Sequence, residues 1–317
     1  MRRGILTDTR RLILSDRFNT ACWPSRLPTV IRPQLRRGGR GRRTRPSGNG
    51  GANNIVETHR VATIAEYSEV ISKLKANNCQ DLILFRGHSD SEWPLQPKIG
   101  RPETRLKGKQ QSELRGVEKR LFENFKRLGL PMMHIKPEDD FDWLAVAQHH
   151  GLPTRLLDWT GNALAALWFS VRYAPVKAHD SQLKAGVVWV LNPQDEDFLE
   201  ETRNAQPFKI NKVKVYRPRH VAGRLIAQAG YFTLHPLDPA TSRFKPLRKD
   251  PTLKGDLIEI TIPGEAFSDL RDDLERHGVS DLTMFPDLDG VCRFVTWNCS
   301  LLEDEADPPN DLLNKRE

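Results

Sequence analysis

The sequence predicts a single α+β domain, in which an N-terminal helical part packs on a C-terminal sheet of mixed or antiparallel strands. Apolar residues recur at helical spacing in the first part of the region that follows residue 57. After residue 186, short apolar runs alternate with Pro, Asn and Gly, which is typical of strands. We therefore divide the chain into a tail at 1–56, a domain at 57–302 and a flexible C-terminal tail at 303–317.

Most of the basic charge lies in the N-terminal tail, whose composition predicts disorder. The first 50 residues hold 13 Arg, no Lys and two acidic residues, a formal charge of +11, which leaves −3 for the rest of a chain whose total is +8. Three explanations of the tail stay open: an arginine-rich arm that binds nucleic acid, a targeting presequence, or residues that the mature protein lacks.

Helix signals come first along the domain. Thr63 and Glu66 form a candidate capping box at the start of an amphipathic helix. Four further helices are expected, over 109–128 with Gly129 as C-terminal cap, 141–150 with Asp139 or Asp140 as N-terminal cap, 162–173 with Thr160 near its start, and 265–276 ended by Gly278.

Apolar runs predict five strands, over 82–85, 187–191, 213–216, 231–234 and 257–262. Arg86 and Gly87 follow the first run directly, so we expect Arg86 at the end of a strand. The stretch 285–290 combines Pro, Asp and Gly and is interpreted as a turn-rich connection.

Several classes of protein and site are not expected from this sequence. No apolar run approaches the roughly 20 residues of a membrane-spanning helix, so we expect no membrane partner. The four cysteines are scattered without a metal-binding spacing, which indicates a reducing, cytoplasmic compartment. His149 and His150 are adjacent and would point about 100° apart on a helix, so no metal is predicted there.

The stretch 148–160 places several polar side chains directly before an apolar helix. Arg155 and Asp158 either form a buried ion pair that fixes a turn between two helices, or lie in a polar cleft. In the second case Arg155 and Arg86 would present forked donors to a phosphate or carboxylate. A second cluster, at an expected helix-to-strand junction, leaves the same alternatives open; its members are Arg224, Gln228, Gly230, Phe232 and His235.

Three motifs resemble those of the FRG domain, a family named after its Phe-Arg-Gly motif. They lie at 84–87 with 93–95, at 148–160 and at 285–290, and the resemblance extends over residues 58–295. The central stretch of 13 residues is the most specific of the three. His88 and His150 stand where the family usually has a glutamine and an aromatic residue.

The resemblance implies a bacterial or phage-associated domain, and we expect a polar cleft for a nucleotide or another anionic small molecule. The motif residues are the candidate binding residues, and they are Arg86, Gly87, His149, Thr154, Arg155, Asp158, Thr160, Asp287 and Asp289.

A looser similarity to ADP-ribosyltransferases suggests an enzyme that uses NAD. In those enzymes an arginine follows the first strand, and a Ser or Thr precedes a later helix; Arg86 and Thr160 are similar to these two elements. The arginine would hold the dinucleotide phosphates, and Thr160 at the helix start would orient the nicotinamide ribose. Such chemistry also needs a carboxylate. Its candidates are Asp287, Asp289 and Glu259.

Two other functions stay open. A non-catalytic module would bind the same nucleotide or anion with the same arginines and would not turn it over. A nucleic-acid-directed enzyme would need clustered acidic residues or a basic folded surface, and the charge of −3 outside the first 50 residues gives that function little support. Nucleic acid is therefore expected to bind only through the N-terminal tail, provided that the mature protein carries this tail.

Overall fold

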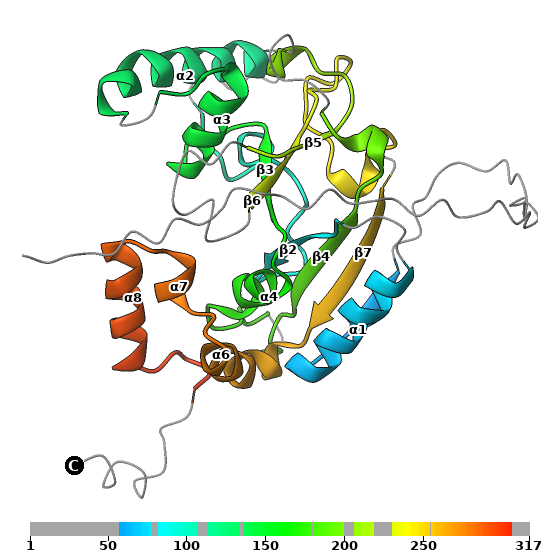
Figure 1. Cartoon of the computed structure of the whole chain (residues 1–317), viewed down its shortest axis with the longest axis vertical. Helices are drawn as coiled ribbons and strands as arrows, with labels where there is room; N and C mark the ends of the chain where they lie inside the picture. The colour runs from blue at the N-terminus through cyan, green and yellow to red at the C-terminus, as the bar shows by residue number, and fades with distance from the viewer. Residues whose placement is uncertain are drawn as a thin grey trace, which may run out of the picture. The chain divides into compact units, whose positions relative to one another are not determined.

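The computed structural model describes residues 57–77, 82–106, 113–133, 136–178, 181–199, 206–218, 230–253 and 255–305. The predicted tail at 1–56, the predicted binding residues Arg224 and Gln228, and residues 306–317 lie outside the described residues. The described residues from Glu57 to Glu305 form an α+β domain, as the sequence predicts (Figure 1).

Seven strands of the described region form one mixed sheet, in the order β1-β7-β4-β2-β3-β6-β5 (Figure 1). The pair β1–β7 is parallel, and all other neighbours are antiparallel. The strands are β1 Thr58–Arg60, β2 Leu84–His88, β3 Leu156–Thr160, β4 Gly186–Asn192, β5 Lys214–Tyr216, β6 Gly230–Leu234 and β7 Asp256–Ile262.

The five predicted strands are present, but β1 and β3 were not predicted. Three of the seven strands, the predicted β2 together with β1 and β3, precede α4 in the chain. The interpretation of 155–160 as a connection between two helices is wrong: Leu156–Thr160 is β3, paired along its whole length with β6. Arg86 lies inside β2 and not at its end.

The five predicted helices are confirmed, and two further helices, α7 and α8, occupy the end of the domain. The stretch 285–290, expected to be a connection, contains the start of α8. The helices are α1 Ile64–Asn77, α2 Leu114–Gly129, α3 Asp140–His149, α4 Ala163–Val171, α6 Phe267–Arg276, α7 Asp281–Met284 and α8 Leu288–Asn298.

Side-chain caps explain where the helices before and after β3 begin. The Asp139 carboxylate accepts hydrogen bonds from the backbone N–H groups of Phe141 and Asp142, at 3.0 and 2.9 Å, as predicted for the start of α3. Asn162, and not Thr160, is the N-terminal cap of α4, because Thr160 is still part of the strand.

Glycines in the left-handed region end two of the predicted helices. Gly151, with φ +83°, follows α3, and Gly278, with φ +76°, follows α6. The prediction of Gly129 as a C-terminal cap is wrong: its φ of −80° is right-handed, and the chain continues into the 3-10 turn Leu130–Met132.

The alternation of side chains along β4 divides the core into two layers. Val188 and Val190 pack in one cluster with residues of α4 and α6, and with Tyr67 of α1. Val187 and Trp189 point to the opposite face, where they pack with residues of the neighbouring strands and of loops such as Leu95. Beyond β2 the sheet continues into β3, β6 and β5, which a third cluster covers with residues of α2 and α3. Different helices thus cover the sheet on the two sides of the β2–β3 seam.

Ordered contacts continue beyond the predicted domain end at residue 302. Arg271 of α6 is 3% exposed in its side chain and forms ion pairs with Asp304 at 2.7 Å and with Glu305 at 2.8 Å. Residues 303–305, predicted to belong to a flexible tail, are therefore anchored on α6.

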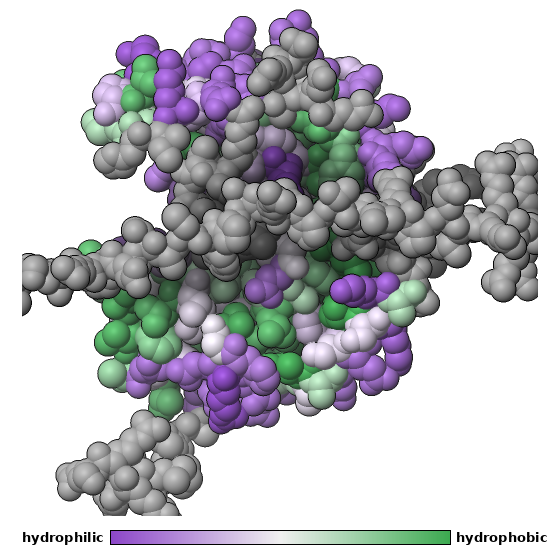
Figure 2. Space-filling model, viewed as in Figure 1, coloured by the Kyte–Doolittle hydropathy of each residue, from purple (hydrophilic) through white to green (hydrophobic). Residues whose placement is uncertain are grey.

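Figure 2 shows hydrophobic side chains gathered over α7 and α8, whereas the side chains over α2 are mainly hydrophilic. Leu288, Val291 and Val295 are exposed along α8. No described helix is both long and apolar enough to cross a membrane.

Candidate functional site

A pocket of about 340 Å³ lies between the C-terminal end of α3 and helix α4, over the seam of β2 and β3. Its size falls at the lower end of the range of small-molecule sites, roughly 300–1,000 Å³. Its walls are Phe85, Arg86, Gly87, Lys98, Gln148, His149, Gly151, Leu152, Asp158, Trp159, Thr160, Phe169 and Phe232.

The seam exists because β2 and β3 pair weakly. Phe85 and Thr160 are the registered pair that joins the two strands, whereas β2 pairs with β4 at five positions. Arg86 bridges the seam: its Nη1 donates to the Asp158 carbonyl oxygen at 2.7 Å and lies 3.5 Å from the Asp158 carboxylate. A side chain thus takes a hydrogen-bonding position that a neighbouring strand would otherwise fill.

Each residue of the Phe-Arg-Gly motif has its own task at this seam. Phe85 is 3% exposed and packs in the core cluster beneath α4. Arg86 points to the seam. Gly87 lets the backbone of α4 approach, since a Cβ there would lie 2.0 Å from the Ala166 carbonyl oxygen and 2.7 Å from the Ser170 nitrogen. The motif therefore sets the distance between α4 and β2 and points the guanidinium toward the pocket.

The guanidinium of Arg86 is only partly used by the protein. Its Nε donates to His88 Nε2 at 2.8 Å, and Nη1 donates to Asp158, while Nη2 makes no hydrogen bond to a described residue. The side chain is 15% exposed. Burial lowers the pKa of Arg86 to about 10, so the group stays charged at neutral pH. A charged donor facing a pocket without a protein acceptor is suited to an anion.

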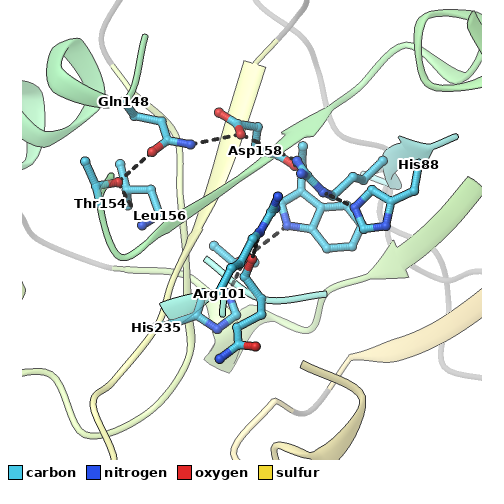
Figure 3. A network of polar contacts seen from close by, with 11 residues as sticks. His88, Arg101, Gln148, Thr154, Leu156, Asp158 and His235 are labelled. Atoms are coloured by element: carbon cyan, nitrogen blue, oxygen red, sulfur yellow. Dashed lines mark hydrogen bonds and ion pairs between the residues drawn. The ribbon is translucent and has the colours of Figure 1, made fainter. Parts of the chain in front are cut away.

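His88 supports Arg86 as a neutral acceptor. Because its Nε2 accepts from the arginine Nε–H, the imidazole proton is on Nδ1. Burial, and then the charges of Arg86 and Arg101, hold the pKa of His88 well below its usual value. Arg101 lies near both groups and donates its Nε–H to the Gln96 carbonyl oxygen at 2.9 Å (Figure 3). Two arginines therefore lie near His88, and one of them, Arg86, lines the pocket.

A second cation lines the pocket. Lys98 donates from Nζ to the carbonyl oxygen of Gly151 at 3.0 Å, and this neutral acceptor leaves its charge uncompensated by any carboxylate of the described chain. Asp158 is the acidic side chain among the described wall residues, and it is 54% exposed.

The carboxylate of Asp158 is also held by a relay of hydrogen bonds that begins at Thr154 (Figure 3). The Thr154 hydroxyl donates to Gln148 Oε1 at 2.7 Å, and Gln148 Nε2 donates to Asp158 Oδ2 at 2.9 Å. The backbone N–H of Leu156 in turn donates to the Thr154 hydroxyl at 3.1 Å. The relay connects the start of β3 to the pocket wall.

Residues 81–179 match the family model described as the FRG domain. The chain contains an FRG domain. The matched residues include β2, α3, β3 and α4, which together supply most of the pocket walls. Searches of the curated proteins and of the solved structures gave no match. The motif at 285–290, which we included in the resemblance, lies outside the matched residues.

The FRG domain brings five of the predicted site residues to one pocket. These are Arg86, Gly87, His149, Asp158 and Thr160. Thr154 does not line the pocket and reaches it through Gln148. The Thr160 hydroxyl accepts from the backbone N–H of Asn162 at 3.0 Å, which places it beside the start of α4.

Arg155 is not brought to the pocket. Its side chain is 1% exposed and donates to both carboxylate oxygens of Glu118, from Nε at 2.8 Å and from Nη2 at 2.5 Å. Nη1 donates to the Pro207 carbonyl oxygen at 2.9 Å. The predicted Arg155–Asp158 pair is therefore absent. Two positions three apart in an extended segment point to opposite faces, whereas a turn between helices would have let them meet.

The three carboxylates considered for catalysis also lie elsewhere. Asp287 is the N-terminal cap of α8, where it accepts from the Gly290 backbone N–H at 2.8 Å, and Asp289 belongs to the first turn of that helix. Glu259 of β7 lies 3.5 Å from Arg248. None of the three is among the described residues that line the pocket.

Sequence reasoning missed several wall residues. Lys98, Gln148 and Phe169 were not selected as site residues, although Gln148 belongs to the most specific motif and Phe169 to the apolar run after it. Lys98 follows Pro97 in an irregular segment and carried no signal of its own. No cluster of three or more His, Cys, Asp or Glu side chains in the described residues is placed to hold a metal ion.

His235, from the second predicted polar cluster, is buried directly after β6. The Trp159 indole N–H donates to the Thr233 hydroxyl at 3.0 Å, and that hydroxyl lies 2.9 Å from His235 Nε2. Burial, with the charges of Arg155 and Arg86 as smaller causes, lowers the pKa of His235 to about 3. The imidazole is neutral in the folded protein at neutral pH.

The buried His235 makes stability depend on pH. The imidazole of His235 takes up a proton below about pH 6.5 in the unfolded chain, but only near pH 3 in the folded chain. Its contribution to the free energy of unfolding is therefore present above pH 6.5 and is lost as the pH falls toward 3. The wild-type protein loses free energy of unfolding between pH 7 and pH 5. We expect this loss to be smaller in His235→Gln, by about 2 kcal/mol. Urea unfolding at the two pH values measures this. The exposed-residue control Gln206→Leu should keep the wild-type difference, and an equal difference in His235→Gln would contradict the assignment.

Proposed function

We propose that the pocket binds an anionic small molecule of the nucleotide class. The observation that carries the proposal is that Arg86 lines the pocket with an Nη2 group that makes no hydrogen bond to a described residue, and that the second cation of the pocket, Lys98, has only a carbonyl partner among the described residues. One guanidinium and one ammonium group in the walls of one pocket are suited to the oxygens of a phosphate or diphosphate.

The remaining walls favour a nucleotide over a bare inorganic anion. Phe169 is partly exposed in the wall and contributes aromatic surface, which stacks on planar rings, whereas Trp159 and Phe232 are buried. Asp158 is the exposed acceptor on the wall and is suited to sugar hydroxyl groups. The volume of about 340 Å³ is enough for one nucleotide half, so the second half of a dinucleotide such as NAD would extend from the pocket mouth.

Removal of Arg86 tests this proposal. Arg86→Ala is expected to weaken binding of ADP, ADP-ribose or NAD by about 10- to 100-fold, because a hydrogen bond to a charged group contributes about 1.5–3 kcal/mol. Isothermal titration calorimetry measures the dissociation constants. Arg276→Ala is the matched control, since Arg276 is exposed and Asp273, at 2.8 Å, is its partner among the described residues. Unchanged affinity in Arg86→Ala, or no binding of any of the three ligands by the wild type, would refute the proposal.

A second candidate function is cleavage of NAD in ADP-ribosyl transfer, and the position of Asp158 favours it. The exposed carboxylate would stabilise positive charge on the ribose as the bond between C1′ and the nicotinamide nitrogen breaks. Nicotinamide would leave as a neutral base. Water or an acceptor nucleophile would then form the new bond to C1′ and release one proton. Arg86 and Thr160 keep the tasks expected from the resemblance.

Nicotinamide release distinguishes an enzyme from a binding module. We expect Asp158→Asn to abolish release while NAD binding is largely retained. Asp287→Asn is the control, because asparagine keeps the cap of α8. Loss of nicotinamide release in Asp287→Asn, but not in Asp158→Asn, would instead assign the catalytic carboxylate to Asp287, outside the pocket. Binding without release in the wild type would favour the non-catalytic module.

A further inference from the structure

Gln148 lies near the C-terminal end of α3, with its side chain in the pocket wall. Its amide is engaged at both ends: Oε1 accepts from the Thr154 hydroxyl at 2.7 Å, and Nε2 donates to Asp158 Oδ2 at 2.9 Å (Figure 3). An amide used in this way connects a buried residue with an exposed carboxylate.

The direction of the amide follows from its partners. The Thr154 hydroxyl already accepts the backbone N–H of Leu156, so its own proton is directed to Gln148. Thr154 is 2% exposed, which leaves its hydroxyl no alternative in solvent. With Oε1 facing Thr154, the Nε2 donors must face Asp158. The side-chain amide is therefore oriented by the backbone of β3.

Asp158 in turn acts on the anion-binding group. Its carbonyl and carboxylate oxygens both lie within reach of Arg86 Nη1, at 2.7 and 3.5 Å. The carboxylate is 54% exposed, and its Oδ2, the oxygen that lies 3.5 Å from Arg86 Nη1, also accepts the hydrogen bond from Gln148 Nε2. When Nη1 is engaged by Asp158 and Nε by His88, the planar guanidinium can present only Nη2 to the pocket.

We propose that Gln148 is a positioning residue, which fixes the Asp158 carboxylate and through it the orientation of the Arg86 guanidinium. The ligand readout of this proposal rests on the proposed nucleotide binding, whereas the orientation of Arg86 does not. A neutral amide suits this task better than a carboxylate, because a glutamate would place a second negative charge about 3 Å from Asp158.

The first experiment measures Arg86 in the protein without ligand. The ¹⁵N order parameter of its Nε–H bond is expected to be high in the wild type and to fall in Gln148→Leu, which removes both hydrogen bonds of the amide. Gln206→Leu is the matched control, since Gln206 is exposed and makes no side-chain hydrogen bond to a described residue. An unchanged order parameter in folded Gln148→Leu would overturn the proposal.

A double-mutant cycle tests whether the relay acts as a unit. Thr154→Val should lower the Arg86 order parameter in the wild-type background and have little further effect in Gln148→Leu, while Thr154→Ser keeps the hydroxyl and the wild-type value. Additive effects of the two substitutions would show that Thr154 and Gln148 act separately. If Thr154→Val does not fold, the Arg86 order parameters of the single variants Thr154→Ser and Gln148→Leu still decide the role of Gln148.

The binding readout uses ADP as the probe. We expect Gln148→Leu to weaken ADP about 10-fold, and Gln148→Glu to weaken it at pH 8 and regain affinity toward pH 5, where two adjacent carboxyl groups share a proton. A purely structural residue would not change the pH profile, so parallel profiles for Gln148→Glu and the wild type would count against the proposal. If the wild type does not bind ADP, the proposed nucleotide binding is refuted. The order parameter of Arg86 then still decides whether Gln148 is a positioning residue.

Discussion

Glu118→Ala is expected to lower the free energy of unfolding by about 3–5 kcal/mol, because it leaves the guanidinium of Arg155 buried without its counter-charge. Arg155 and Glu118 are 1% and 3% exposed in their side chains and share two hydrogen bonds. The Phe208 ring lies 4.9 Å from the guanidinium carbon and closes the site to water. The loss is large because rehydration of the cation would require this packing to open.

Urea unfolding of Glu118→Ala measures this cost. Glu123→Ala is the matched control on α2, since Glu123 is exposed and its replacement should change stability by less than about 0.5 kcal/mol. The double variant Glu118→Met with Arg155→Met should recover much of the loss, because no unpaired charge remains. A cost below about 1 kcal/mol for Glu118→Ala would mean that the pair contributes little to holding α2 against the start of β3.

The buried pair also explains why the sequence pattern was misinterpreted around β3. A polar residue on either side of Leu156–Leu157 hides the alternation of a strand, and the sequence does not indicate which partner each polar residue has. Arg155 finds its partner on α2, 37 positions earlier, and Asp158 finds Arg86, 72 positions earlier. Pairings over such distances depend on the register of the sheet, which single-sequence patterns do not give.

Local signals were the reliable part of the sequence. Asp139 and the glycines after α3 and α6 act through neighbouring backbone groups, so their residue types alone predicted the helix ends. Gly129 shows the limit of such signals, since the backbone there continues in a right-handed turn. Asp287 shows a similar limit, since its residue type does not indicate that its carboxylate accepts from the Gly290 backbone N–H and caps α8.

Site residues that belong to a sequence motif were predicted. Site residues that reach the pocket only because distant segments fold together were missed. Arg86, His149 and Asp158 come from motifs that the FRG domain resemblance identified. Lys98 and Phe169 line the pocket because a loop and α4 lie beside β2 and β3 in the folded chain. Their residue types are common in solvent-exposed or core positions, so no sequence pattern separates them from those alternatives.

Gly87→Ala is expected to destabilise the domain by about 3 kcal/mol or more, because the added methyl group overlaps the backbone of α4. The Cβ would lie 2.0 Å from the Ala166 carbonyl oxygen and 2.7 Å from the Ser170 nitrogen, and neither atom belongs to a flexible side-chain end. Either α4 moves away from β2 or β2 shifts across the seam. Both changes displace the neighbouring Arg86, so any folded Gly87→Ala protein should also bind nucleotide more weakly.

Urea unfolding and calorimetry with ADP test the two expected effects of Gly87→Ala together. Gly116→Ala is the matched control: Gly116 lies on the exposed face of α2, a Cβ there would meet its nearest atom at 3.5 Å, and alanine should raise helix stability by up to about 1 kcal/mol. Wild-type stability in Gly87→Ala would mean that α4 tolerates the methyl group by a small shift. Since Gly87 contacts α4 while Arg86 faces the seam, lost stability with unchanged affinity would show that helix packing and guanidinium position are independent.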